Sequence, residues 1–180
     1  MGHSIRALPG LVAVLAAALG LTAPAAAQLA KGTQAPDFTT RAALAGEEFG
    51  FSLSQALADG PVVLYFYPKA FTQGCTLEAN AFAEAMDEFR AVGASVIGMS
   101  NDDIATLERF SQEECRDAFP VGVASPRLIA AYDVALGGSG LASRTSYVIA
   151  PDGRIAMVHS NSDYRGHVAR TLASVRALVQ

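Results

Sequence analysis

The chain has 180 residues, a net charge of −4, 51% hydrophobic residues and only two cysteines. This length suits one domain with a substantial core. Because no run of lysine or arginine occurs, the sequence predicts no nucleic-acid partner.

The first 27 residues have the layout of a secretory signal peptide. Arg6 supplies the positive start, residues 7–22 are apolar, and Ala25-Ala26-Ala27 offers a small-residue cleavage site. The apolar stretch is short for a membrane span of ~20 residues, and a retained N-terminal anchor stays open as the alternative. We therefore expect an exported protein of a bacterial periplasm, with residues 28–180 as a single domain and no membrane span after cleavage.

The first half of that domain predicts a loop, a strand and a helix. Residues 31–40 contain glycine and proline and predict a loop leading into a first strand or hairpin. The run over 62–67 is continuously apolar and predicts a buried central strand, which Pro68 ends. Apolar residues then recur at the spacing of one helix face, which predicts a helix over 76–91.

The second half alternates strands with helices. We expect a strand over 94–99, a helix running to about Cys115, a strand over 119–124, a helix over 126–132, a hairpin formed by 145–150 and 154–159, and a final helix from about Asp163 to Leu178. This order predicts an α/β fold, a three-layer sandwich with a mixed central sheet, and it resembles an elaborated thioredoxin fold.

Cys75 is the leading candidate for chemistry. It falls between the strand over 62–67 and the following helix, in the first turn of that helix. Amide N–H groups there lack intrahelical partners and the helix dipole favours negative charge, so the position favours the reactive thiolate. Gly74 lets the backbone approach closely, and Thr72 can direct its hydroxyl into the same pocket. The alternative is a small buried hydrophobic residue, the commonest fate of a free cysteine.

The surrounding motif resembles that of a known family. The pattern Pro68-x-x-x-Thr72-x-x-Cys75-Thr76-x-Glu78-Ala79 resembles the active-site motif of peroxiredoxins, and the most similar branch is the bacterioferritin-comigratory, atypical two-cysteine type. The resemblance extends to Ala35-Pro36-Asp37-Phe38 and to Arg144-Thr145-Ser146-Tyr147-Val148-Ile149-x-Pro151-Asp152-Gly153. It covers nearly all of residues 28–180 and implies a peroxiredoxin-type, thioredoxin-like fold.

The resemblance also implies roles for individual residues. Cys75 is then the peroxidatic cysteine, whose thiolate attacks a peroxide O–O bond and becomes a sulfenic acid. Thr72 is implied to hydrogen-bond the thiolate and the peroxide, Pro68 to shield the sulfur from water, and Arg144 to stabilise the negative charge. On residue patterns alone, Thr72 is equally a simple helix N-cap and Arg144 a surface charge, while Glu78 is an acidic residue that a first helical turn favours anyway.

The second cysteine departs from the commonest pattern of this branch. Many members carry it five positions after the first, where this chain has Asn80. Cys115 instead resembles the resolving cysteine of variants that carry it in the following helix, and an exported protein with two cysteines favours a bridge. The bridge would require both predicted helices to unwind partly, because disulfides need Cα atoms within about 7 Å. Cys115 also falls near the apolar stripe of its helix, so a purely structural role stays open.

The sequence therefore predicts a thiol-dependent peroxidase that reduces hydrogen peroxide and organic hydroperoxides through Cys75, is resolved by Cys115, and is reduced by an external thioredoxin-like dithiol protein. Two alternatives stay open: a one-cysteine peroxiredoxin resolved by an external thiol, and a non-enzymatic thioredoxin-fold module with a structural Cys75–Cys115 disulfide.

No cofactor is expected from the motifs present. His159 and His167 are predicted to form no cluster with a cysteine or a carboxylate, so a metal site is not expected. Neither Cys-x-x-Cys nor Gly-x-Gly-x-x-Gly occurs, which argues against a thioredoxin-like reductase and against bound flavin or nicotinamide. The sequence leaves a monomer or a homodimer equally open.

Overall fold

The computed structural model describes residues 1–2 and 28–180, so the predicted signal peptide lies, apart from its first two positions, outside the described residues. The elements in chain order are β1 (Thr39–Leu44), β2 (Glu47–Ser52), α1 (Leu53–Asp59), β3 (Val62–Phe66), α2 (Gln73–Ala91), β4 (Ser95–Ser100), α3 (Ile104–Glu113), β5 (Val121–Val123), α4 (Pro126–Ala131), β6 (Thr145–Ile149), β7 (Ile155–Ser160) and α5 (His167–Leu178). Within the described part of the chain, no helix combines the length and apolar character needed to cross a membrane.

The strands form one mixed sheet of order β2-β1-β5-β4-β3-β6-β7. β3, β4 and β5 run parallel to one another, whereas the pairs on either side of them are antiparallel. Parallel neighbours need crossover connections, and α2 and α3 provide them. The predicted mixed sheet is therefore confirmed, with the fully buried β3 near its centre.

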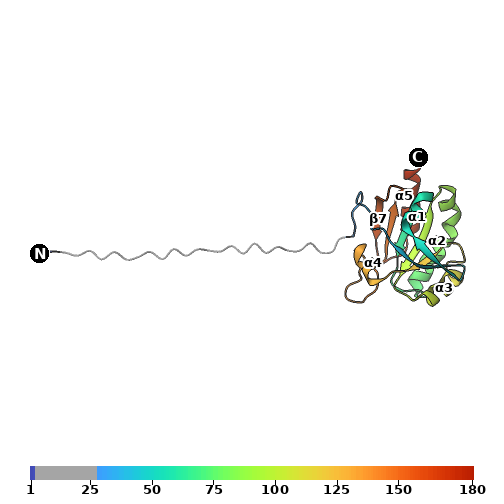
Figure 1. The fold of residues 1–180 in the computed structure, drawn as a ribbon, viewed down its shortest axis with the longest axis horizontal. Helices are drawn as coiled ribbons and strands as arrows, with labels where there is room; N and C mark the ends of the chain where they lie inside the picture. Colours follow the sequence, from blue (N-terminus) through green and yellow to red (C-terminus); the bar gives the residue numbers. More distant parts are fainter. Residues whose placement is uncertain (3–27) are drawn as a thin grey trace.

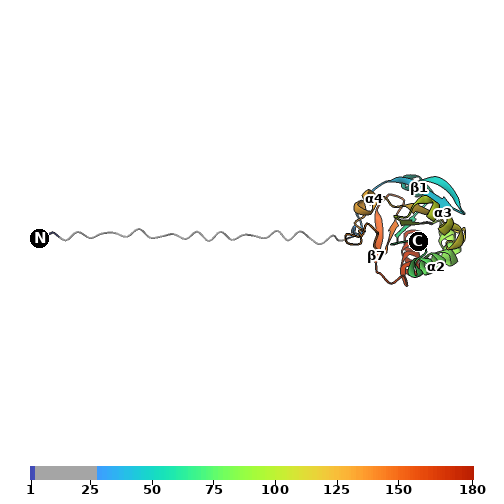
Figure 2. The ribbon, with the colours of Figure 1, turned by 90° about the horizontal axis from the view of Figure 1, so that it is seen from below.

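Helices cover both faces of the sheet, which makes the three predicted layers (Figures 1 and 2). Successive side chains of β3 point to opposite faces. Tyr65 packs in one core cluster with residues of α2, α3 and α5, whereas Leu64 and Phe66 pack in a second cluster with residues of α1 and α4. Cys75 and Cys115 both belong to the first cluster, so the two thiols lie on the same side of the sheet.

Most predicted elements are present, and the differences have local causes. The expected hairpin at the start is β1–β2, and α1 follows it as a short helix that the sequence pattern did not reveal, capped by Ser52, whose hydroxyl accepts from the amide of Gln55. The final helix begins at His167 rather than near Asp163, because Gly166 before it has the left-handed φ of 94°.

The position of Cys115 also differs from the prediction. α3 ends at Glu113, so Cys115 lies in the turn after the helix and not within it. The chain leaves the helix because Arg116 and Asp117 both adopt left-handed conformations, with φ of 52° and 58°. Cys115 is nevertheless fully buried.

Candidate active site

The turn between β3 and α2 brings Cys75 to the start of a helix. Thr72 is the N-cap of α2, and its carbonyl accepts a hydrogen bond of 2.9 Å from the amide of Thr76. Cys75 is the third helical residue and so belongs to the first turn of the helix, where backbone N–H groups have no intrahelical partner. The residue is only 2% exposed. The predicted location in the first helical turn is therefore confirmed.

The loop that precedes the helix is fixed by a carboxylate at the end of β4. Asp102 Oδ2 accepts hydrogen bonds of 2.8 Å from the amide of Ala70 and from the hydroxyl of Ser100. Phe71 has a left-handed φ of 61°, which costs energy in a residue with a Cβ. Its ring packs edge-on against Phe110 and beneath the guanidinium of Arg109. These contacts hold the loop in one conformation.

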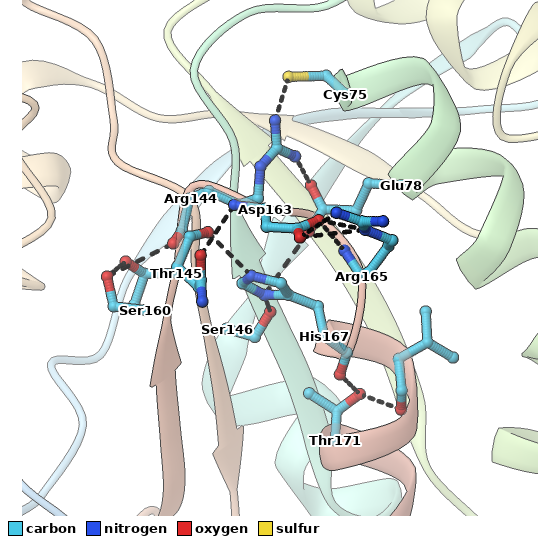
Figure 3. Close-up of polar contacts among 12 residues, drawn as sticks. Cys75, Glu78, Arg144, Thr145, Ser146, Ser160, Asp163, Arg165, His167 and Thr171 are labelled. Atoms are coloured by element: carbon cyan, nitrogen blue, oxygen red, sulfur yellow. Dashed lines mark hydrogen bonds and ion pairs between the residues drawn. The ribbon is translucent and has the colours of Figure 1, made fainter. Parts of the chain in front are cut away.

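Arg144 reaches the sulfur from the neighbouring strand. The antiparallel register of β3 and β6 pairs Phe66 with Thr145, so Arg144 lies just beyond the end of β3. Its guanidinium donates to Cys75 Sγ at 3.4 Å, to a carboxylate oxygen of Glu78, and to the carbonyl of Ser162 at 3.1 Å. Figure 3 shows this fork, with the cation lying between the thiol and the carboxylate. At 8% exposure, Arg144 is an integral part of the buried site and not a surface charge.

Gly74 leaves room for this approach. A Cβ built at Gly74 would lie 3.1 Å from Nη2 of Arg144, the same nitrogen that donates to Cys75. A methyl group there would press against the guanidinium. The absence of a side chain at Gly74 therefore leaves room for the cation to reach the sulfur, a role that the sequence alone does not assign to this glycine.

Behind Arg144 lies a second buried layer that the sequence did not predict. Glu78 and His167 are fully buried, and Glu78 Oε1 lies 3.7 Å from His167 Nδ1 without a hydrogen-bond partner. Nδ1 of His167 lies 2.8 Å from the hydroxyl of Ser146 (Figure 3). The other ring nitrogen of His167 lies 3.1 Å from the carbonyl of Asn161. From the sequence, His167 is considered only as a possible metal ligand, and this contact with Glu78 is not foreseen. The contact joins α2 to α5, and no local pattern reveals such a pairing.

Burial shifts the pKa values of the ionisable groups in this part of the site. It raises the pKa of Glu78 to about 8, although Arg144 pulls in the opposite direction. It lowers the pKa of His167 to about 4, so this ring is neutral near pH 7. Burial opposes charge on Arg144 as well, but the charges of Glu78 and Cys75 outweigh it and raise the arginine pKa. Near neutrality the cation therefore faces the sulfur and a carboxyl group that readily holds a proton.

Two of the predicted residues occupy the expected loop. The hydroxyl of Thr72 donates to the carbonyl of Lys69 at 2.9 Å, and its oxygen keeps free lone pairs. Pro68 is half-buried immediately after β3. Their roles at the sulfur and toward substrate stay predictions.

Cys75 and Cys115 are both free thiols. Both belong to the core cluster that contains Tyr65 and Tyr67, whose phenol pKa values are raised by burial. Burial, followed by the charges of Glu114 and Asp117, raises the pKa of the Cys115 thiol. Cys115 is therefore protonated and inaccessible in this conformation.

No metal-binding cluster accompanies these groups. Among residues 1–2 and 28–180, no three histidine, cysteine or acidic side chains gather closely enough to hold a metal ion. The chemistry that the described site offers is that of a thiol beside a cation at a helix N-terminus.

Comparisons with known proteins agree with this arrangement. The AhpC/TSA family model matches residues 31–158. A Mycobacterium tuberculosis protein that carries the name of a peroxiredoxin is 35% identical over 130 residues, which are 70% of this chain and 84% of that protein. Chloroplast peroxiredoxin Q of Oryza sativa subsp. japonica is 30% identical over 154 residues, which are 84% of this chain and 69% of that protein.

Solved structures show the same fold. The crystal structure of peroxidoxin BcpB from M. tuberculosis superposes with a TM-score of 0.75 at 34% identity, over 83% of this chain and 98% of that one. M. tuberculosis AhpC, at 24% identity, has a TM-score of 0.74 over 84% of this chain and 94% of that one, and supports the fold alone. The predicted thioredoxin-like fold of the peroxiredoxin type is thus confirmed.

The unusual pKa of Glu78 predicts how stability varies with pH. Between pH 6.5 and 8 the folded chain keeps a proton on Glu78 that the unfolded chain, with the ordinary value of 4.5, has lost. The free energy of unfolding should therefore fall with rising pH in this window, by about 2 kcal/mol. His167 acts outside the window, because its lowered pKa costs stability only as the pH falls below 6.5. Urea unfolding at several pH values measures the slope.

Glu78→Gln keeps the shape of the protonated side chain and should remove this slope, even where absolute stability is lower. Glu88→Gln is the control, since it changes an exposed carboxylate of the same helix. Equal slopes in wild type and Glu78→Gln would show that Glu78 does not hold the proton.

Proposed function

Because this chain belongs to the AhpC/TSA family and is a thiol-dependent peroxidase, we propose that Cys75 is its peroxidatic nucleophile and that Cys115 resolves the oxidised sulfur. One observation carries the first assignment: Cys75 occupies the first turn of α2 with a guanidinium N–H of Arg144 at 3.4 Å from its sulfur. A cation and a helix N-terminus together favour the thiolate, which is the form that attacks peroxides.

In the first step the Cys75 thiolate attacks the terminal oxygen of the peroxide. The O–O bond breaks, the sulfur becomes a sulfenic acid, and the hydroxide or alkoxide leaves and takes a proton from solvent. Arg144 stays hydrogen-bonded to Glu78 and to the carbonyl of Ser162, so it is held in place as negative charge moves from sulfur to oxygen. Such preorganised donors are the usual source of transition-state stabilisation.

Thr72 is proposed to orient the peroxide. Its hydroxyl proton is engaged by the carbonyl of Lys69, so the oxygen is left to accept a hydrogen bond. The O–H of the incoming peroxide is the donor that fits. Pro68, half-buried at the end of β3, is proposed to keep water from the sulfur.

In the second step the Cys115 thiolate attacks the sulfenic sulfur of Cys75. The S–S bond forms, the S–O bond breaks, and the oxygen leaves as water after gaining a proton. An external dithiol protein of thioredoxin type then exchanges with the disulfide and restores both thiols. Supporting this assignment, both cysteines lie in one core cluster on the same side of the sheet. Because Cys115 is buried and protonated, its turn has to open before it can react.

We also propose that the protein acts outside the cytoplasm, in a bacterial periplasm. The support is the signal-like sequence over residues 1–27, with its apolar stretch and its small-residue cleavage site. In that compartment the reductant has to be an exported thioredoxin-like protein, since cytosolic dithiols are out of reach.

Cys75→Ser should abolish peroxide consumption, because a serine hydroxyl is a far weaker nucleophile at neutral pH. A coupled assay with hydrogen peroxide and a dithiol reductant measures the loss. Turnover at the wild-type rate in this variant would remove Cys75 from the active site.

Arg144→Gln should slow the reaction of reduced protein with peroxide by about 100-fold, since it removes a charged donor aimed at the reacting sulfur. Stopped-flow measurement of a single oxidation gives this rate without the later steps. Arg176→Gln is the control, because Arg176 is an exposed arginine that pairs with Glu88 and not with the sulfur. A rate within twofold of wild type for Arg144→Gln would show that the guanidinium does not act on the sulfur.

One equivalent of peroxide should give an intramolecular Cys75–Cys115 disulfide in wild type, detected by peptide mapping. Cys115→Ser should keep the first oxidation, lose reduction by dithiol proteins, and accumulate sulfinic acid at Cys75. If Cys115 stays a free thiol while Cys75 is oxidised, the one-cysteine mechanism replaces this proposal. A disulfide that forms without any peroxide consumption would favour the structural bridge.

A further inference from the structure

Asn80 makes hydrogen bonds with both residues that flank Cys115. Its Nδ2 donates to a carboxylate oxygen of Glu114 at 3.1 Å, and its Oδ1 accepts a hydrogen bond from the guanidinium of Arg116. Asn80 lies on α2, the helix that also carries Cys75. One amide therefore joins the helix of the first cysteine to the turn of the second.

The same amide also reaches the neighbour of Cys75. Nδ2 of Asn80 donates to the carbonyl of Thr76 at 2.8 Å, in the first turn of α2. A single NH2 group thus bridges the residue after Cys75 and the residue before Cys115. Movement of either segment away from this group would break one of its two hydrogen bonds.

The turn held by Asn80 stores backbone strain. Arg116 and Asp117 are consecutive non-glycine residues in the left-handed region, a conformation that persists only when surrounding contacts enforce it. Arg90 of α2 supplies one further contact, a hydrogen bond of 2.6 Å to the carbonyl of Ala118. Release of these side-chain contacts would let the turn relax and move Cys115 out of the core.

Among the residues that contact this turn, Asn80 is best placed to control whether the turn opens. The ion pair of Arg116 with Glu84 spans 3.3 Å between exposed side chains, and such pairs contribute little. Asn80 is half-buried, and both of its bonds to the turn involve a charged partner, which strengthens them. It also hydrogen-bonds the residues on both sides of Cys115, so removal of its side chain would release the turn at both positions.

We propose that Asn80 is a positioning residue for the resolving step, a latch that holds the turn over residues 114–118 closed and so limits how often Cys115 is presented to the sulfenic acid at Cys75. The inference rests on the proposed function of Cys115 as the resolving cysteine. Many members of the branch that this chain resembles carry the second cysteine at the position of Asn80. In this chain the same position would instead control access to Cys115.

By holding the turn closed, Asn80 determines whether the sulfenic acid at Cys75 forms a disulfide or is oxidised further. A sulfenic acid at Cys75 either meets Cys115 and loses water, or meets a second peroxide, which adds one oxygen to give sulfinic acid and leaves as water or alcohol. While the turn stays closed, only the second route is open. A tighter latch therefore makes the enzyme more sensitive to excess peroxide.

The first arm of the test measures opening of the turn without any peroxide chemistry. In a Cys75→Ser background, Cys115 is the single thiol, and its labelling by Ellman's reagent reports how often the turn opens. Asn80→Ala should accelerate this labelling about 10-fold. Alanine favours helix more than asparagine does, which offsets part of the lost hydrogen bonding, so global stability measured by urea unfolding should fall less than the labelling change implies.

Glu113→Ala is the matched control. It removes an exposed ion pair with Arg109 next to the turn, but Glu113 makes no hydrogen bond to Asn80, so labelling should stay at the wild-type rate. An unchanged labelling rate in Asn80→Ala, or an equal rise in Glu113→Ala, overturns the latch.

The second arm uses the protein with both cysteines. After one equivalent of hydrogen peroxide, Asn80→Ala should form the Cys75–Cys115 disulfide about 10-fold faster and accumulate less sulfinic acid at high peroxide, while the first oxidation keeps its rate. Faster labelling without faster disulfide formation overturns the inference but leaves Cys115 as the resolving cysteine. If wild type forms no disulfide at all, the proposed function of Cys115 fails, and the inference fails with it.

Discussion

One buried cation, shared between a sulfur and a carboxyl group, organises the active site. Arg144 donates to Cys75, Glu78 and the carbonyl of Ser162, so the planar guanidinium has a single orientation. Burying such a charge is costly unless it is paired, and the partners come from different elements of the fold. Three features keep the guanidinium in place: the register of β3 against β6, the absence of a side chain at Gly74, and the position of His167 on α5 beside Glu78.

The protonation state of Glu78 determines how strongly Arg144 interacts with the sulfur of Cys75. With a proton on Glu78, Arg144 faces a neutral carboxyl group beside the sulfur; without it, a carboxylate competes with the sulfur for the same cation. The unpartnered Oε1 and the neutral ring of His167 both disfavour the ionised carboxylate. Near neutral pH the protein interior thus favours the interaction of Arg144 with the sulfur of Cys75 over its interaction with an ionised Glu78.

Residue patterns revealed most of this fold because its signals are local. The apolar run of β3, the helical spacing in α2 and the hairpin turn after β6 each lie within one short segment, and the place of Cys75 follows from two of them. Arg144 entered through family resemblance, since its partners lie 69 and 66 positions away in sequence. The Glu78–His167 contact and the grip of Asn80 on the turn of Cys115 depend on how helices pack together. No pattern along the chain encodes that packing, and it was out of reach of sequence reasoning.

The pairing of β3 with β6 has a consequence for the chain before it folds. Cys75 and its cation meet only through that antiparallel register, so an unfolded chain carries a cysteine with no arginine beside it. Its sulfur then lies beside neither a helix N-terminus nor a guanidinium. Under the proposed role of Cys75, fast reaction with peroxide is a property of the completed tertiary structure, and the rate of oxidation at Cys75 would measure how much of a sample is native.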